Sequence, residues 1–204
     1  MKNKSYDKEY FKKRDNLDLK IASIIKNLSQ KNGLKNILDV GCGTGKLVKY
    51  LNKYKFNAVG CDPYFIKKES KTFVKASANK LPFRTNSFDL VTNISVIEHL
   101  SKAEASRFLA EAHRVLRANG FIFLVTPNYN SIWRQIQGKN WFGYSDPTHI
   151  NFYSPGSLAH SLKRAGFKNI KFSFKADNLS FPWFLLISTP FWRLRDSFFI
   201  SAKK

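Results

Sequence analysis

Cysteine is scarce in this chain, which has only Cys42 and Cys61 among 204 residues. Two cysteines cannot build a disulfide framework, and neither stands in a Cys-x-x-Cys or Cys/His spacing typical of zinc, so we expect no metal. Long hydrophobic runs are also lacking. The most apolar stretch, residues 181–192, is interrupted by Pro182 and Pro190 and is far shorter than the ~20 residues of a membrane-spanning helix. No apolar signal segment follows the basic N-terminus. We therefore expect a cytoplasmic protein.

Acidic side chains are few as well. The chain carries 14 aspartate and glutamate residues against 35 lysines and arginines, which gives a formal net charge of +21 at pH 7. A surface of this sign attracts anionic partners, and a nucleic acid and an anionic membrane are the two candidate classes. A source genome that favours Lys, Asn and Phe explains the same charge without any partner. Charge alone therefore does not decide the function.

Apolar residues, by contrast, are plentiful and evenly spread. Hydrophobic residues make up 43% of the chain and aromatic residues 15%, which excludes a disordered or low-complexity protein. No internal repeat or Gly/Ser linker interrupts the pattern, and the length suits one domain with its own core. We expect a single domain over residues 1–204, with a helical cap at 1–34 and substrate-side insertions at 127–153 and 177–195.

Helical and extended patterns alternate along the chain. Apolar residues at helical spacing predict helices at 17–32, 46–54, 102–117 and 155–165. Short apolar runs predict strands at 36–40, 56–60, 72–76, 88–92, 121–125, 170–174 and 197–202. An Asn119-Gly120 turn precedes the fifth strand. The expected fold class is α/β, a doubly wound, mostly parallel seven-stranded sheet covered on both faces by helices, with ligands at the carboxyl ends of the strands.

A glycine-rich turn follows the first predicted strand. Residues 37–46 read ILDVGCGTGK, so a buried strand runs into Gly41, Gly43 and Gly45 and then into a helix. Such a turn lets the backbone approach a ligand closely and leaves the first helical N–H groups pointing at it. Asp62 ends the second strand about 20 positions on, where a carboxylate can accept hydrogen bonds from both hydroxyls of an adenosine ribose.

The spacing of this turn selects among adenosine ligands. Lys46 stands where a G-x-G-x-x-G fingerprint needs its third glycine, and the segment does not match the P-loop pattern. Asp39, two residues before the first glycine, would repel a pyrophosphate but attract an ammonium or a sulfonium group. S-adenosylmethionine carries both cations, and we expect it as the cofactor.

Several further segments occur in an order that resembles one family. ILDVGCGTGKL, AVGCDP, KLPF, FDLV, IEHL and HRVLRANG follow one another along the chain. Together they resemble the class I S-adenosylmethionine-dependent methyltransferases, and more narrowly the small-molecule branch that includes ubiquinone-type O-methyltransferases. The segment 138–167 is similar to the part that follows the fifth strand in that branch, and 196–204 resembles the reversed last strand of its Rossmann-like sheet.

The resemblance implies a set of cofactor contacts in the glycine turn and after the second, third and fourth strands: Asp39, Gly41, Cys42, Gly43, Gly45, Asp62, Pro63, Ser77, Ala78, Asn93 and Ile94. Ser77 is a departure, because the family often has an acidic residue there that holds the adenine amino group. Either the serine hydroxyl replaces it or the cofactor binds more weakly.

Cys42 has two possible roles. We favour a small residue that fits a tight turn over a thiolate nucleophile at a helix N-terminus.

Two histidines are candidates for a catalytic base. Methyl transfer to a hydroxyl benefits from a positioned base whose pKa lies near neutrality. His149 lies in the long connection 127–153, where it either serves as that base or ties the connection to the domain by hydrogen bonds. His99 either acts as a base near the methyl acceptor or orients the loop after the fourth strand.

Aromatic residues are candidates for the acceptor pocket. Trp133, Trp141, Phe142 and Tyr144 would either line such a pocket or pack the long connection onto the domain. The aromatic residues of 181–192 would either enter an anionic membrane interface to collect a lipid-linked acceptor or pack in a core or dimer contact. Tyr6, Tyr10 and Phe11 would form a lid over the cofactor or belong to a frayed terminus.

The sequence predicts an enzyme that transfers the methyl group of S-adenosylmethionine to an oxygen or nitrogen of a small-molecule, glycan or lipid-linked acceptor. A nucleic-acid methyltransferase is one alternative, although residues 93–96 lack the Asn/Asp-Pro-Pro-aromatic signature of base-directed enzymes. A basic binding module that keeps the fold without turnover is the other. The sequence indicates no oligomeric state.

Overall fold

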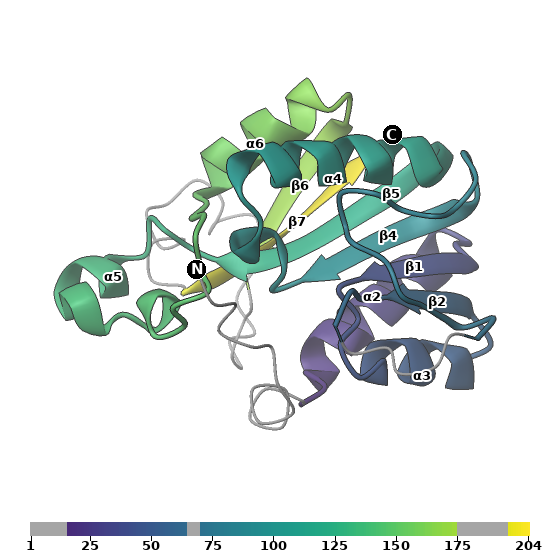
Figure 1. Cartoon of the computed structure of the whole chain (residues 1–204), viewed down its shortest axis with the longest axis horizontal. Coiled ribbons are helices and arrows are strands. Elements are labelled where there is room, and N and C mark those ends of the chain that lie inside the picture. Colours follow the sequence, from purple (N-terminus) through teal and green to yellow (C-terminus); the bar gives the residue numbers. More distant parts are fainter. Residues whose placement is uncertain (1–15, 65–69, 175–195) are drawn as a thin grey trace.

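A computed structural model describes residues 16–64, 70–174 and 196–204 (Figure 1). The lid expected at Tyr6, Tyr10 and Phe11 and the insertion expected at 177–195 lie outside the described residues. No helix of the described part is long and apolar enough to span a membrane.

One mixed sheet organises the described residues. Its strand order is β3-β2-β1-β4-β5-β7-β6. The strands β1 to β5 pair with one another in parallel, and β7 is antiparallel to both β5 and β6. The seven strands are β1 (Asn36–Val40), β2 (Asn57–Cys61), β3 (Phe73–Val74), β4 (Phe88–Ile94), β5 (Leu116–Pro127), β6 (Lys168–Phe174) and β7 (Ser197–Lys203). The predicted seven-stranded, mostly parallel sheet with a reversed last strand is confirmed.

Helices cover both faces of this sheet (Figure 1). One face carries α4 and α6, whose apolar residues join the larger core cluster, and the other carries α2 and α3, which join the second cluster. The α-helices are α2 (Leu19–Lys31), α3 (Lys46–Lys53), α4 (Lys102–Val115), α5 (Ile132–Gln137) and α6 (Pro155–Arg164). As predicted, α6 begins with Ser154 as N-cap and Pro155 in its first turn.

The boundary between α4 and β5 differs from the prediction. The helix ends at Val115 rather than at residue 117, because Leu116 already pairs with Phe88 in the sheet. The next register pair, Leu90 with Phe121, leaves extra residues on β5 that loop out as a bulge. Asn119 takes a left-handed φ of 63° in that bulge, so the expected turn lies within the strand.

The connection 127–153 contains short helices that the sequence did not predict. Besides α5, two 3₁₀ turns are present, η2 (Gly138–Asn140) and η3 (Phe142–Tyr144). A further 3₁₀ turn, η1 (Ile97–His99), follows β4. Neither α5 nor η2 has a buried residue, so neither contributes to the core.

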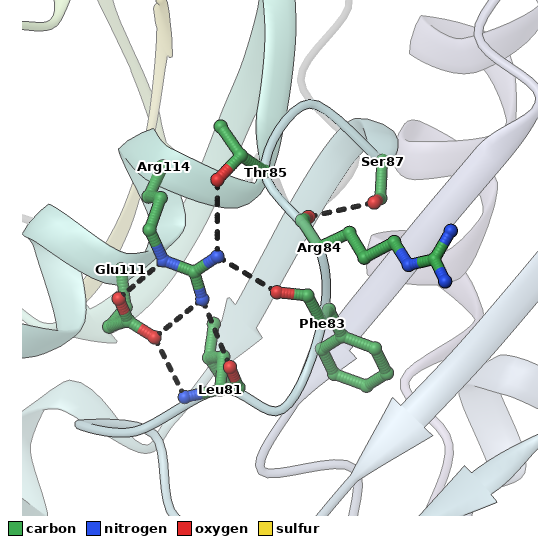
Figure 2. Close-up of polar contacts among 7 residues, drawn as sticks. All are labelled: Leu81, Phe83, Arg84, Thr85, Ser87, Glu111 and Arg114. Carbon is green, nitrogen blue, oxygen red and sulfur yellow. Dashed lines mark hydrogen bonds and ion pairs between the residues drawn. The ribbon is translucent and has the colours of Figure 1, made fainter.

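Arg114 at the end of α4 holds the loop that leads into β4 (Figure 2). Its guanidinium donates to the carbonyl oxygens of Phe83, at 2.8 Å, and Leu81, at 3.0 Å. It also forms a bidentate pair with Glu111, whose carboxylate accepts the Leu81 N–H at 2.9 Å. Both members of this ion pair thus bind the same loop, which positions the KLPF segment after Ser77 and Ala78.

Replacing Arg114 with alanine is expected to lower the free energy of unfolding by about 2 kcal/mol, because two loop carbonyls and Glu111 lose their partner. Urea denaturation measures this. Arg107→Ala, on the exposed face of the same helix, is the matched control and should change stability by less than about 0.5 kcal/mol. Equal effects of the two substitutions would contradict the assigned role of Arg114.

Candidate functional site

A cavity of about 630 Å³ opens at the carboxyl ends of β1, β2 and β4. Its walls come from the glycine turn after β1, the segments after β2 and β3, the turn η1, and the connection 127–153. Six acidic residues line it: Asp18, Asp39, Asp62, Glu98, Glu104 and Asp146. Among the described residues of the lining, Lys46 is the only lysine or arginine. The cavity is therefore acidic in a chain whose net charge is strongly positive.

The glycine turn is shaped by contacts that exclude a side chain. Gly41 has a φ of 79° and Gly45 a φ of 74°, a region that favours glycine. A Cβ atom on Gly41 would lie 2.3 Å from Val96, and one on Gly45 would lie 2.2 Å from Phe73. Gly41 and Gly43 line the cavity, whereas Gly45 is the N-cap of α3 and does not. The glycines thus let Val96 and Phe73 pack against the turn, and the turn places the start of α3 at the cavity, where Lys46 and Leu47 line it.

Asp62 is held at the rim of this turn by backbone donors. Its carboxylate accepts the Gly43 N–H at 3.1 Å and the Tyr64 N–H at 2.8 Å. These bonds fix a buried carboxylate, 6% exposed, beside the glycine turn. Pro63 lies next to it in the cavity wall. The position suits the ribose-binding role that the sequence predicts.

Asp39 lies deeper in the same cavity, at the end of β1. It is 4% exposed, and its Oδ1 accepts a hydrogen bond from Thr92 Oγ1 at 2.8 Å. Burial raises the pKa of Asp39 to about 7, with a smaller upward contribution from Asp62, while the Thr92 hydrogen bond lowers it. Burial makes ionisation of this carboxyl group unfavourable, and a neighbouring cation stabilises its negatively charged form. This chemistry fits a sulfonium or ammonium group.

Cys42 lines the cavity but is packed as an apolar residue. Burial raises its pKa far above the usual range, and the nearby carboxylates of Asp39 and Asp62 raise it further. A Cβ atom on Gly60 would lie 2.6 Å from the Cys42 sulfur. These observations agree with a small residue in a tight turn rather than a thiolate nucleophile.

The remaining predicted cofactor residues divide into two groups. Ser77, Ala78 and Ile94 line the cavity. Asn93 does not, because it is fully buried, donates to the Val40 carbonyl at 3.1 Å and accepts the Ile97 N–H at 3.1 Å. Asn93 therefore ties the end of β1 to η1 and positions the cavity wall from behind.

The two predicted base candidates meet at the other end of the cavity. The ring centroids of His99 and His149 lie 4.6 Å apart, although 49 residues separate them in the sequence. The Gly143 carbonyl lies 2.7 Å from His149 Nδ1 and must accept its proton, so Nε2 carries the lone pair in the neutral ring. Nε2 lies 3.8 Å from an Asp146 carboxylate oxygen.

Thr148 fixes the tautomer of His99 in the same way. Its hydroxyl donates to Asp146 at 2.6 Å and lies 2.9 Å from His99 Nδ1. Because the hydroxyl proton is engaged by the carboxylate, the hydroxyl oxygen accepts the Nδ1 proton of His99. Both rings thus direct Nδ1–H groups at oxygens of the 142–149 segment.

Glu98 is a functional candidate that the sequence analysis missed. It is 1% exposed and lines the cavity beside both histidines. Burial raises its pKa to about 8, and Asp146 adds to the rise, whereas a backbone hydrogen bond and the Thr126 hydroxyl lower it. The Glu-His pair in IEHL was visible, but nothing local in the sequence indicates that this glutamate is buried and faces the cavity.

The aromatic candidates lie mostly outside the cavity. Trp141 is fully buried, and its indole donates to Asp196 at 3.0 Å. Tyr144 packs against Trp141, and Trp133 is 40% exposed. Only Phe142 of this group lines the cavity. Trp141 thus takes the packing role that the sequence left open, and anchors the connection 127–153.

Comparison with known proteins agrees with this geometry. A family model described as a methyltransferase domain matches residues 11–171. The protein MJ1252 of Methanocaldococcus jannaschii is 37% identical over 140 residues, which cover 64% of this chain and 51% of the relative. A ubiquinone biosynthesis O-methyltransferase of Rhizobium etli is 30% identical over 105 residues, 45% of this chain and 41% of the relative. A SAM-dependent methyltransferase from Archaeoglobus fulgidus has the same fold, with a TM-score of 0.69 at 21% identity, over 98% of this chain and 100% of that one.

The chain therefore belongs to the methyltransferase domain family, in the class that uses S-adenosylmethionine. This confirms the family and cofactor that the sequence motifs indicated. The chain spans about half the length of the curated relatives it matches, covering 51%, 54% and 50% of three of them.

The raised pKa of Asp39 predicts a pH dependence of stability. Its pKa is about 7 in the folded chain and near 3.8 in the unfolded chain. Between these two pH values Asp39 keeps its proton in the folded chain but loses it in the unfolded chain. The stability that this protonation contributes is therefore fully present below pH 4 and is lost as pH rises through 7. The free energy of unfolding of the wild type should therefore fall relative to Asp39→Asn, by up to about 1.4 kcal/mol per pH unit.

Urea denaturation between pH 4 and pH 8 measures this difference. Asp89→Asn is the control, because hydrogen bonds from Asn36, Lys35 and Arg117 outweigh burial and lower the pKa of Asp89, so its contribution lies below pH 4. Parallel pH profiles of the wild type and Asp39→Asn would disprove the assignment.

Proposed function

We propose that the chain binds S-adenosylmethionine in this cavity and transfers its methyl group to an oxygen or nitrogen of an acceptor held beside His99 and His149. The observation that supports this most is that one cavity joins the glycine turn, Asp39 and Asp62 to the two histidines. When bound, the cofactor supplies an electrophilic methyl group on a sulfonium.

The residues at the glycine-turn end fit the cofactor's chemistry. Asp62 would accept hydrogen bonds from the ribose hydroxyls, and Ser77, Ala78 and Pro63 would border the adenosine. Asp39 would stabilise the positive charge of the methionine end, which the acidic walls of the cavity favour generally. Gly41 and Gly43 both line the cavity, where a ligand could approach their backbone closely.

The residues at the other end fit acceptor activation. His149 holds its proton on Nδ1 against the Gly143 carbonyl, so Nε2 can take a proton from an acceptor. His99 is oriented likewise by Thr148. Alignment of the acceptor with the methyl group in a confined cavity can supply about 7–11 kcal/mol of the rate enhancement.

The acceptor class is a small molecule, a glycan or a lipid-linked compound. A relative named as a ubiquinone biosynthesis O-methyltransferase supports a small, oxygen-bearing acceptor. A nucleic-acid acceptor is the second candidate, which the net charge of +21 favours. Measuring S-adenosylhomocysteine release with quinol, glycan, lipid and RNA acceptors tests both. Cofactor binding with no release for any acceptor would leave the non-catalytic binding module.

Calorimetric titration with S-adenosylmethionine and with S-adenosylhomocysteine tests the cofactor site. Asp62→Asn should weaken binding by about 10- to 100-fold, because a charged acceptor of the ribose hydroxyls is lost. Asp89→Asn is a matched control. Asp89 also accepts two backbone N–H groups, those of Lys35 and Asn36, but at the opposite end of β1. Equal weakening in both variants, or no binding by the wild type, would contradict the proposed site.

A further inference from the structure

We propose that the outer face of α2 and α3 binds single-stranded nucleic acid. These two helices cover the side of the sheet opposite α4 and α6 (Figure 1). Residues 19–61 carry eight lysines but only one acidic residue, Asp39, which is buried and lines the cavity. The lysines are Lys20, Lys26, Lys31, Lys35, Lys46, Lys49, Lys53 and Lys55. The proposal goes beyond the proposed function, because binding at this face requires neither the cofactor nor methyl transfer.

The acidic residues that the structure describes are engaged elsewhere. Six of them line the cavity. Asp89 and Glu111 are paired with arginines outside α2 and α3, and Asp196 holds the connection 127–153. Within the described part of the chain, the positive charge is therefore not spread evenly. The negative groups gather in the cavity, and the outer face of α2 and α3 is left cationic.

Helix stability accounts for only some of these lysines. A cation in the last turn of a helix is favoured by the helix dipole, which explains Lys31 and Lys53. Lys26 lies in the middle of α2, and Lys49 lies in the first half of α3, whose first turn has no acidic residue. No described carboxylate forms an ion pair with Lys26, Lys49 or Lys53. These charges therefore suit an external anionic partner.

Two tyrosines of α3 connect the lysines into one surface. The ring centroids of Tyr50 and Tyr54 lie 5.0 Å apart, and the ammonium group of Lys26 in α2 lies 4.6 Å from the Tyr54 centroid. Tyr54 is 48% exposed, so solvent reaches part of its ring. Lysines contact phosphates, and exposed aromatic rings stack with unpaired bases. The combination therefore favours a single strand over a duplex, whose bases already stack on one another.

An anionic lipid surface is the other partner that these lysines could attract. Helices that bind at a membrane surface also present large apolar side chains, which enter the acyl region. In α2 and α3, both of which the structure describes completely, Leu19 is the one strongly exposed aliphatic residue. A single leucine offers little apolar surface to a bilayer. Phosphates and bases, by contrast, match both the lysines and the tyrosines of this face.

The face begins beside the cavity and continues to the opposite edge of the sheet. Lys46, the first residue of α3, lines the cavity. At the far end, the Lys35 carbonyl accepts the Asn57 N–H at 2.9 Å, so the loops that follow α2 and α3 are in contact. A strand bound along α3 would therefore reach the mouth of the cavity. Its phosphates would stay on the lysines outside, because the acidic cavity walls repel them.

Fluorescence anisotropy with a short, labelled, single-stranded RNA of mixed sequence tests this surface on the whole chain. The test variant replaces three lysines of the face: Lys26→Gln, Lys49→Gln and Lys53→Gln. It should weaken binding by about 10-fold or more at low salt, because phosphate contacts are lost. The slope of log affinity against log salt concentration should become shallower by about 2, since each contact with a single strand contributes roughly 0.7.

A matched control removes the same charge from exposed lysines outside α2 and α3. It combines Lys102→Gln, Lys163→Gln and Lys171→Gln. Because the net charge of the two variants is equal, only a localised surface predicts different results, and the control should change affinity by less than about 2-fold. Circular dichroism checks that both variants are folded.

Substitution of Tyr54 tests the stacking contact. Tyr54→Ala should weaken RNA binding by about 5-fold or more, because a base loses its stacking partner. Tyr54→Phe should keep the affinity, since the phenyl ring still stacks. A duplex of the same sequence should bind more weakly than the single strand. Unchanged affinity in Tyr54→Ala, or equal affinity for the duplex, would refute the recognition of single strands.

Absence of RNA binding by the wild type, or equal loss in both triple variants, would overturn the proposed surface. Tighter binding to phosphatidylserine vesicles than to RNA, lost in the test variant, would assign the face to a lipid surface instead. Calorimetry with S-adenosylmethionine separates this proposal from the proposed function, because the three substituted lysines lie outside the described cavity lining. RNA binding without cofactor binding would refute the proposed function alone, and the reverse would refute the surface alone.

Discussion

Parallel pairing of β1 with both β2 and β4 is the constraint on which the site depends. Because three adjacent strands run in the same direction, their carboxyl ends meet at one edge of the sheet. Asp39 lies at the carboxyl end of β1, and Asp62 and Glu98 follow the ends of β2 and β4, so residues far apart in sequence share one cavity. Reversal of any of these strands would move its carboxylate to the opposite edge, where Asp89 lies.

The sheet and the glycine turn were predictable because their signals are local. Each strand carries its own apolar run, and the turn carries its own glycines, whose φ values the structure confirms for Gly41, Gly43 and Gly45. The first half of the candidate site could therefore be predicted from short segments. The bulge in β5 and the end of α4 at Val115 could not, since they depend on pairing between Leu116 and Phe88.

The acceptor half of the site was predictable only in part. The long connection indicated a functional loop, and the two histidines were visible as residue types, but their proximity arises from hydrogen bonds between Glu98 and residues 150 and 151. The same limit applies to Asn93 and Trp141. Both are buried, and their hydrogen bonds to Val40 and Asp196 show them to be supports behind the cavity wall. A sequence pattern does not distinguish a residue that lines a cavity from one that holds the lining.

Asp196 has a wider consequence for how this fold can change. Its carboxylate accepts Ser131 Oγ at 2.9 Å and the Trp141 indole at 3.0 Å, and its carbonyl accepts the Asn128 N–H at 2.7 Å. The connection is thus fixed to the start of β7 on either side of α5 and η2, neither of which buries a residue. Insertions and substitutions at 132–140 can accumulate with little effect on the segment 142–149, so the exterior of the enzyme can diversify while the acceptor wall stays the same.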